Sequence, residues 1–272
     1  MGARASFADG KNANYTSIAA LRPSAQNGAM EHLRRLTATF VLWALCFTAG
    51  AAGMGVAIDV GHSLEKPGAT SARGRVEFEF NRDLALAIGQ ALTPRGLEAR
   101  MIGADGSENG LNGRPAKARG VSFFLSVHHD SVQPQFLEAW VHEGAERLYS
   151  DRYAGFSLFV SRRNASVQAS LHCASRLGEE LRRAGFRPSL YHAEPIPGEM
   201  KPFADRANGV HYYDNLAVLK GAPSAAVLLE AGVIVNRDEE LLLADPPRRG
   251  RMAEAVAAGL ARCLDKSRTA RP

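Results

Sequence analysis

The chain has 272 residues, of which 46% are hydrophobic and 22% are charged, with a net charge of +5. This composition is that of an ordinary globular protein and excludes a disordered chain. No basic stripe with interleaved aromatic residues is visible, so we expect no nucleic-acid partner.

Residues 1–51 resemble a targeting segment rather than part of a fold. No charged side chain occurs in residues 36–58, which follow Arg34 and Arg35, and the small residues Ala49-Gly50-Ala51 offer a cleavage site. The strongly apolar stretch, about Leu36 to Phe47, is shorter than the roughly 20 residues of a spanning helix. A signal peptide is therefore favoured over the alternative, an uncleaved membrane anchor. We expect an exported protein of the periplasm or cell envelope.

From residue 52 onward, strand and helix patterns alternate along the chain. The first half predicts a strand at Met54–Asp59, a glycine-rich loop, a helix at Val76–Leu92, a strand at Leu97–Ile102, a short helix near 114–119 and a buried strand ending at His128. Residues 131–153 resemble an irregular insertion. The alternation favours a mostly parallel sheet with helices on both faces.

The second half continues the same alternation. It predicts a strand at 155–160, a long amphipathic helix at 166–184, an irregular proline-rich stretch at 185–215, short strands at 216–219 and 225–230, and helices at 238–244 and 248–264. The interpretation is a single α/β domain over residues 52–265, followed by a frayed tail at 266–272. Cys173 and Cys263 lie in predicted helices, and either a disulfide or two buried thiols fits the pattern.

Three predicted strands end in side chains with matching chemistry, namely His62, His128 and Glu230. Ligands of open α/β sheets collect at the carboxyl ends of strands. A catalytic zinc takes three protein ligands from His, Glu and Asp and leaves a position for water. Glu77, in the first turn of the helix after the glycine-rich loop, is well placed to be the third ligand beside His62 and His128.

Glu230 interrupts a run of apolar residues, and a buried carboxylate is costly unless it is paired with a charge or a metal. An apolar setting that raises its pKa makes such a carboxylate a good general base. Each residue also has a structural alternative. The histidines can be ordinary core residues, Glu77 an acidic residue favoured at a helix N-terminus, and Glu230 an internal salt-bridge partner.

Four segments in a fixed order carry a resemblance to the zinc-dependent N-acetylmuramoyl-L-alanine amidases, the family called amidase type 3. It covers the chain from about Val56 to Leu264. The segments are Asp59-Val60-Gly61-His62 with Pro67-Gly68-Ala69, Glu77 with Asn81, Ser126-Val127-His128, and Leu228-Leu229-Glu230-Ala231-Gly232-Val233-Ile234-Val235-Asn236.

The resemblance implies that Zn²⁺ is bound by His62, Glu77 and His128 and that Glu230 is the catalytic acid/base. It also implies a sheet of about six strands and cleavage of the amide between the lactyl group of N-acetylmuramic acid and L-alanine in peptidoglycan. The chain departs from the family after its second histidine, where His129-Asp130 stands in place of a small residue and Asn. His129 should point to the opposite face of its strand, although it could compete as a ligand, and Asp130 could orient an imidazole.

Alternative functions are an exported zinc peptidase that cuts within the stem peptide and a non-catalytic wall-binding homologue. Arg114 and residues 185–215 are candidates for contact with substrate carboxylates or glycan. A monomer is expected, and an activator protein is an open alternative. In some relatives an inserted helix occludes the zinc until a partner removes it. Residues 185–215 show no clear amphipathic helix, so such regulation is not expected here.

Overall fold

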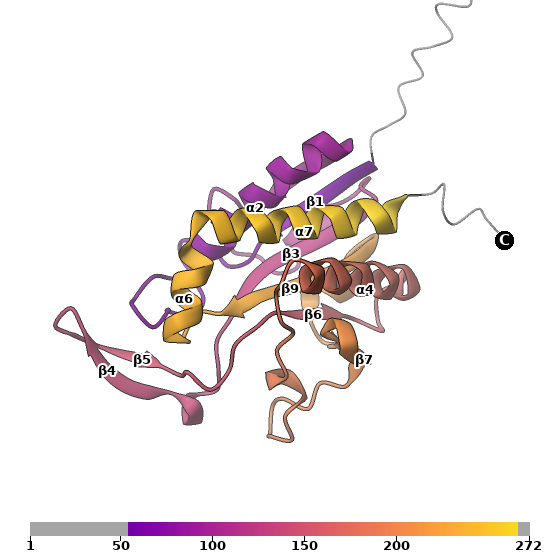
Figure 1. The fold of residues 1–272 in the computed structure, drawn as a ribbon. Coiled ribbons are helices and arrows are strands. Elements are labelled where there is room, and N and C mark those ends of the chain that lie inside the picture. Colours follow the sequence, from indigo (N-terminus) through magenta and orange to yellow (C-terminus); the bar gives the residue numbers. More distant parts are fainter. Residues whose placement is uncertain (1–53, 266–272) are drawn as a thin grey trace, which may run out of the picture. The chain divides into compact units, whose positions relative to one another are not determined.

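The computed structural model describes residues 54–265 (Figure 1). The predicted targeting segment at 1–51 and the tail at 266–272 lie outside the described residues. The helices are α2 (Glu77–Leu92), α3 (Gly113–Ala116), α4 (Val167–Arg183), α5 (Ala217–Lys220), α6 (Arg237–Ala244) and α7 (Pro246–Leu264). Among residues 54–265, no helix combines the length and the apolar character needed to cross a membrane.

The strands are β1 (Met54–Val60), β2 (Leu97–Ile102), β3 (Phe123–Asp130), β4 (Glu138–His142), β5 (Ala145–Tyr149), β6 (Ser157–Val160), β7 (Phe203–Asp205), β8 (Val210–Tyr212) and β9 (Ala225–Val233). Seven form one sheet in the order β2-β1-β3-β9-β6-β8-β7. Its first four strands are parallel, whereas β6 is antiparallel to β9 and β7 is antiparallel to β8. The predicted mostly parallel α/β domain is confirmed. The sheet exceeds six strands because 185–215 contains β7 and β8, which are too short for a periodic signal.

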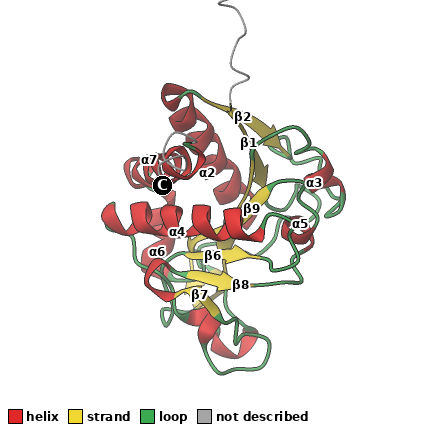
Figure 2. Cartoon of the chain, turned by 90° about the vertical axis from the view of Figure 1, so that its right-hand side faces the viewer, coloured by secondary structure: helices red, strands yellow, loops and turns green. Residues whose placement is uncertain are grey.

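Helices cover both faces of this sheet, but to different depths (Figure 2). On one face, α2, α4 and α7 pack on side chains such as Val56, Ile58 and Leu125. On the other face, the short helix α5 and the end of α3 cover Ala57, Phe124 and Leu228. Successive strand residues point to opposite faces, so His128 and Glu230 belong to the second face. The long helices therefore cover the first face, and the thinner cover of the second face leaves room for a cleft.

Two further predicted segments differ from the structure. Residues 131–153 are not simply irregular, because β4 and β5 form a two-stranded hairpin that extends away from the main sheet (Figure 1). Its turn, Glu143-Gly144, has φ values of 50° and 78°, as a two-residue primed turn requires. Asn or Asp is the usual first residue of such a turn, and Glu143 gave no signal. Residues 216–219 were predicted to be a strand, but α5 occupies Ala217–Lys220, a segment too short to show either period.

Cys173 and Cys263 are joined by a disulfide, which resolves the alternative that the sequence left open. Their Cα atoms lie 5.1 Å apart, within the normal range for a disulfide. The bond connects α4 to α7, two helices that pack against the same face of the sheet. It therefore ties the C-terminal helix to the middle of the chain.

Candidate metal centre

The structure brings His62, Glu77 and His128 together at the carboxyl ends of the parallel strands. One potential ligand atom from each lies within 4.8 Å of the others, an arrangement that could hold a metal ion. His62 follows β1, Glu77 is the first residue of α2, and His128 lies in β3. Nε2 of His62 is 2.9 Å from Oε2 of Glu77, and Nδ1 of His128 is 3.1 Å from Oε1 of the same carboxylate.

Two glycines, Gly61 and Gly68, make room for these side chains because they have no Cβ atom. A Cβ atom at Gly61 would overlap the imidazole of His128, and one at Gly68 would overlap Glu77 and His62. Gly68 also has a φ of +82°, a conformation that glycine adopts without steric cost. His62 itself has a φ of +68°, which is uncommon for a residue with a side chain and is found more often at functional sites.

The Glu77 carboxylate is oriented by several donors. The backbone amide of Ala69 and the side-chain amide of Asn81 each donate a hydrogen bond to it, both at 3.1 Å. Burial raises the pKa of Glu77, but the hydrogen bonds and positive charges of His128 and His62 outweigh burial and hold it well below the usual range. Glu77 is therefore an ionised carboxylate, the form in which it can bind a metal.

Arg114, a candidate for contact with substrate, is among the residues that line the cleft beside the candidate metal centre, but most of its side chain is buried in contacts within the protein. It is 3% exposed and donates hydrogen bonds to Oδ1 of Asp59, at 2.7 Å, and to the backbone carbonyls of Val60 and His62. The other oxygen of Asp59 accepts a hydrogen bond from Ser126 at 2.7 Å. A buried ion pair thus connects β1, β3 and the loop that begins with His62.

Glu230 lies directly opposite His128 in the pairing of β3 with β9. The strand continues to Val233, so Glu230 is not its last residue as the sequence suggested. Its Oε2 atom is buried without a hydrogen-bond partner. Burial raises the pKa of Glu230 well above its usual value, and the negative charges of Asp130 and Glu77 add to this effect, against the opposing charge of His192. A carboxyl group with a raised pKa is suited to accept and release a proton.

His129 points away from this centre, as the strand alternation predicted. Its side chain packs beside Phe80, with ring centroids 5.5 Å apart, and its Nδ1 lies 2.8 Å from Oδ1 of Asn81. Since the Asn81 amide nitrogen already donates to Gly61 and Glu77, its oxygen is the acceptor and Nδ1 of His129 carries the proton. Burial lowers the pKa of His129 to about 3. His129 is a neutral core residue that orients Asn81.

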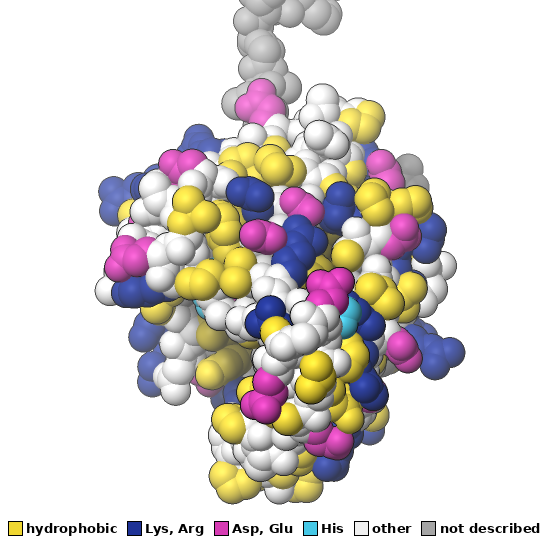
Figure 3. Space-filling view, turned by 90° about the vertical axis from the view of Figure 1, so that its left-hand side faces the viewer, with side chains coloured by type: hydrophobic (Ala, Val, Ile, Leu, Met, Phe, Trp, Pro, Cys, Tyr) yellow, Lys and Arg dark blue, Asp and Glu magenta, His cyan; other side chains and the backbone are white. Residues whose placement is uncertain are grey.

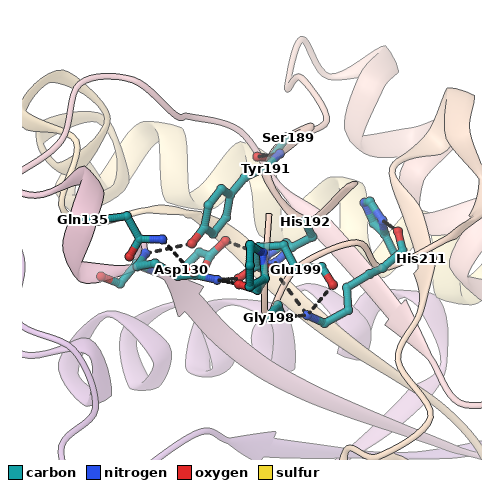
Figure 4. A network of polar contacts seen from close by, with 12 residues as sticks. Asp130, Gln135, Ser189, Tyr191, His192, Gly198, Glu199 and His211 are labelled. Atoms are coloured by element: carbon teal, nitrogen blue, oxygen red, sulfur yellow. Dashed lines mark hydrogen bonds and ion pairs between the residues drawn. The ribbon is translucent and has the colours of Figure 1, made fainter. Parts of the chain in front are cut away.

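Asp130 belongs to a network that sequence analysis did not identify (Figure 4). Its Oδ2 atom is 2.7 Å from Nε2 of His192, and Nδ1 of His192 is 2.8 Å from Glu199. The expectation that Asp130 orients an imidazole is met by His192, not by a member of the candidate metal centre. His192 and Asp130 are 62 positions apart in sequence, so no local pattern connects them.

A cleft of about 520 Å³ adjoins the candidate metal centre. Its lining residues include His62, His128, Lys66 and Asn109, together with Ala217 and Val218 of α5. The cleft lies on the thinly covered face of the sheet. Figure 3 looks toward the end of the molecule that carries the β4–β5 hairpin, and acidic and basic side chains are intermixed over it.

Comparison with solved structures reveals the same fold in several amidases. An N-acetylmuramyl-L-alanine amidase from Mycobacterium smegmatis is 23% identical with a TM-score of 0.62, and the match covers 78% of this chain and 97% of the other. The catalytic domain of an amidase from Bacillus (Paenibacillus) polymyxa var. colistinus is 25% identical with a TM-score of 0.59, covering 78% and 98%. An amidase from Clostridium difficile 630 is 16% identical with a TM-score of 0.61, covering 79% and 98%.

A search of curated protein sequences found no match. The sequence model of one family, Amidase_3, described as N-acetylmuramoyl-L-alanine amidase, matches residues 56–262. This range includes every strand from β2 to β9 and all of the residues that form the candidate metal centre. The chain belongs to the N-acetylmuramoyl-L-alanine amidase family, whose members act on peptidoglycan.

Proposed function

We propose that this amidase is zinc-dependent and that it cleaves the amide between the lactyl group of N-acetylmuramic acid and the L-alanine of the stem peptide. The observation that carries the proposal is the convergence of His62, Glu77 and His128 within 4.8 Å, beside a cleft and in a chain of this family. Two imidazoles and a carboxylate form a ligand set that suits zinc and leaves a coordination position open.

The chemistry of the ligand atoms fits this ion. Glu77 is held ionised by the two histidines, and each of its oxygens faces one imidazole nitrogen. A bound cation would take the place of the protons that Glu77 and the two imidazoles now share in these contacts. Asn81, bonded to Glu77 and braced by His129, keeps the carboxylate in one orientation. Such outer partners are a regular part of metal sites.

His62, Glu77 and His128 would hold the zinc, which would supply Lewis acidity for polarising the scissile carbonyl and for making water nucleophilic near neutral pH. Glu230 performs the proton transfers. As a carboxylate it takes a proton from the attacking water, and as a carboxylic acid it returns that proton to the nitrogen of L-alanine as the amide bond breaks. The raised pKa of Glu230 supports this assignment, because a base that must also act as an acid works best with a pKa near the working pH.

A peptidoglycan substrate places the working site of the enzyme in the cell envelope. We propose that residues 1–51 direct export as a signal peptide and that the protein acts as a monomer.

One structural relative, the CwlD amidase from Clostridioides difficile, was solved in complex with the GerS lipoprotein. Within residues 185–215, all of them described, the structure has only 3₁₀ turns and the strands β7 and β8. We therefore propose that no helix in this segment blocks the cleft.

The test is digestion of purified peptidoglycan, with and without a chelator, followed by identification of the products by mass. The proposal predicts free stem peptides that begin with L-alanine, together with intact glycan strands. This activity should disappear on chelation, return with added zinc, and be absent from the His62→Ala variant. Cuts within the stem peptide would instead indicate a zinc peptidase. Binding to the wall without any product, despite bound zinc, would indicate a wall-binding protein or a missing activator.

A further inference from the structure

Lys66 belongs to a closed turn that follows the candidate ligand His62, and it is one of the residues that line the cleft. Two hydrogen bonds close this turn. The backbone amide of Ser63 donates to the carbonyl of Lys66 at 3.1 Å, and the amide of Lys66 donates to the hydroxyl of Ser63 at 3.0 Å. Ser63 is buried, whereas Lys66 is exposed at the cleft.

The loop at 103–113 holds this turn in place. The amide of Leu64 donates to the carbonyl of Gly106 at 2.9 Å. The hydroxyl of Ser63 donates to the side chain of Asn109, whose nitrogen donates to the carboxylate of Glu65. The backbone at Lys66 therefore has a fixed position beside the candidate metal centre, while the flexible four-carbon side chain lets its ammonium adjust to a ligand.

The charge of Lys66 is not matched by a partner within the protein. The other basic side chain of the lining that is not an imidazole, Arg114, is paired with Asp59. The acidic lining residue Glu108 is paired with Lys117. Among residues 54–265, no carboxylate forms an ion pair with the ammonium of Lys66. The cleft thus presents one positive group that is free to bind an anion.

The stem peptide offers an anion close to the bond that the proposed reaction breaks. The residue after L-alanine is a glutamate joined through its γ-carboxyl group, so its α-carboxyl group is either free or amidated. One residue spans at most about 3.6 Å, so this group lies within about 7 Å of the scissile nitrogen. A substrate whose amide lies at the candidate metal centre therefore brings this group into the part of the cleft that contains Lys66.

We propose that the ammonium of Lys66 binds this free α-carboxylate and makes the enzyme prefer stem peptides whose second residue is not amidated. The inference rests on the proposed function and names the substrate class within it. An ammonium has three donors and no acceptor, so it gains a charge-assisted bond from a carboxylate but only a neutral carbonyl contact from an amide. Arg114 is not available for this role, because Asp59 and backbone carbonyls occupy its donors.

The main test uses two soluble N-acetylmuramoyl peptides that differ only in whether this α-carboxyl group is free or amidated. The unaltered zinc-loaded enzyme should show a kcat/KM about five- to tenfold higher for the free acid, and rising ionic strength should reduce this preference. Lys66→Met should abolish it by raising KM for the free acid while leaving kcat unchanged, the pattern of a lost binding contact. Lys66→Arg, which keeps the charge, should retain the preference.

Lys220→Met is the matched control. Lys220 is also an exposed lysine and is the last residue of α5, a helix that contributes Ala217 and Val218 to the cleft, but it does not itself line the cleft. The control removes the same charge from the protein, so it separates a contact with the substrate from a general effect of net charge. It should leave the preference between the two peptides intact.

Binding gives a second readout that does not depend on turnover. Calorimetry with the zinc-loaded Glu230→Gln variant should show tighter binding of the free-acid peptide, and adding Lys66→Met should remove the difference. Equal affinities for the two peptides, no binding of either, or a preference that survives Lys66→Met would overturn the inference. An unaltered enzyme that cuts neither these peptides nor peptidoglycan would instead reject the proposed function, and the calorimetric comparison would still decide the role of Lys66.

Discussion

Arg114 donates a hydrogen bond to the backbone carbonyl of His62, the residue at which the chain leaves β1 with a φ of +68°. A left-handed backbone at a residue with a Cβ atom costs about 1–2 kcal/mol, and it persists only where surrounding contacts hold it. Arg114 is itself anchored by the buried carboxylate of Asp59. The position of a candidate zinc ligand is thus maintained by the buried ion pair between Arg114 and Asp59.

Arg114→Lys should therefore weaken zinc binding. Lysine keeps the charge but lacks the planar fork that reaches Asp59 and the carbonyls together. We expect a loss of about 10- to 100-fold in zinc affinity, measured by competition with a chelator. Asn164→Ala is the control, because Asn164 also donates to several backbone carbonyls, those of Leu219, Ala222 and Ser224, but supports no candidate ligand. Equal zinc affinities in the two variants would contradict the role of Arg114.

Gly68→Ala should damage the metal centre, whereas Gly120→Ala should not. Both glycines have a φ of +82°, so alanine brings similar backbone strain, about 1–2 kcal/mol, at each position. Only at Gly68 would the added Cβ overlap Glu77 and His62, since nothing lies within 4 Å of a Cβ at Gly120. Thermal unfolding should detect destabilisation in both, and zinc titration should detect a loss of affinity in Gly68→Ala alone. A similar loss in Gly120→Ala would refute the steric explanation.

Glu230→Gln should separate catalysis from metal binding. Removing a general acid/base lowers kcat by about 100- to 10,000-fold, while zinc remains bound because Glu230 is not a proposed ligand. Undiminished hydrolysis by this variant would reject the role of Glu230.

The same variant should show how Glu230 affects stability. The folded-state pKa of Glu230 is raised, so above the unfolded pKa, about 4.3, the group lowers the free energy of unfolding. The zinc-free Glu230→Gln protein should therefore unfold at a higher temperature than the unaltered protein at pH 7. The difference should shrink as the pH falls below about 4, because Glu230 is then protonated in both the folded and the unfolded protein. A destabilised variant at pH 7 would contradict this sign.

Reduction of the Cys173–Cys263 disulfide should destabilise the fold. The two cysteines are 90 positions apart, and a cross-link that closes a long loop restricts the unfolded chain. The expected loss in the free energy of unfolding is about 2–4 kcal/mol, measured with and without a reductant. The Cys173→Ser, Cys263→Ser double variant is the control and should not respond to reductant. Two reactive thiols in the folded, unreduced protein would show that the bond is absent.

The sequence predicted most of the fold correctly where elements are long. The helices at α2, α4 and α7 and the strands β1, β2 and β3 lie within a few residues of their predicted bounds, because hydrophobic periodicity over many residues reports directly on which side of an element is buried. The hairpin of β4 and β5, the strands β7 and β8, and the helix α5 were missed. They are too short for a period, and their conformation depends on contacts with distant segments, such as the hydrogen bond from Trp140 to the carbonyl of Ala72.

The candidate metal residues were also within reach of the sequence, because each stands at the end of a strand or the start of a helix and strand ends meet at one edge of a sheet. The sequence by itself thus determined the α/β class, the family resemblance and the identities of His62, Glu77, His128 and Glu230 as candidates. Only the tertiary structure decided how their surroundings are arranged. It placed His129 in the core, paired Arg114 with the buried carboxylate of Asp59 and brought His192 to Asp130.

These decisions share one physical reason. A side chain's charge state and hydrogen bonds depend on which groups lie within a few ångströms of it, and in a folded chain those groups come from segments that are far apart in sequence. Asp130 and His192 are 62 positions apart, and Asp59 and Arg114 are 55 apart. Periodicity and motif spacing describe neighbours along the chain, whereas burial and charge pairing arise only once the sheet has brought distant strands and loops together.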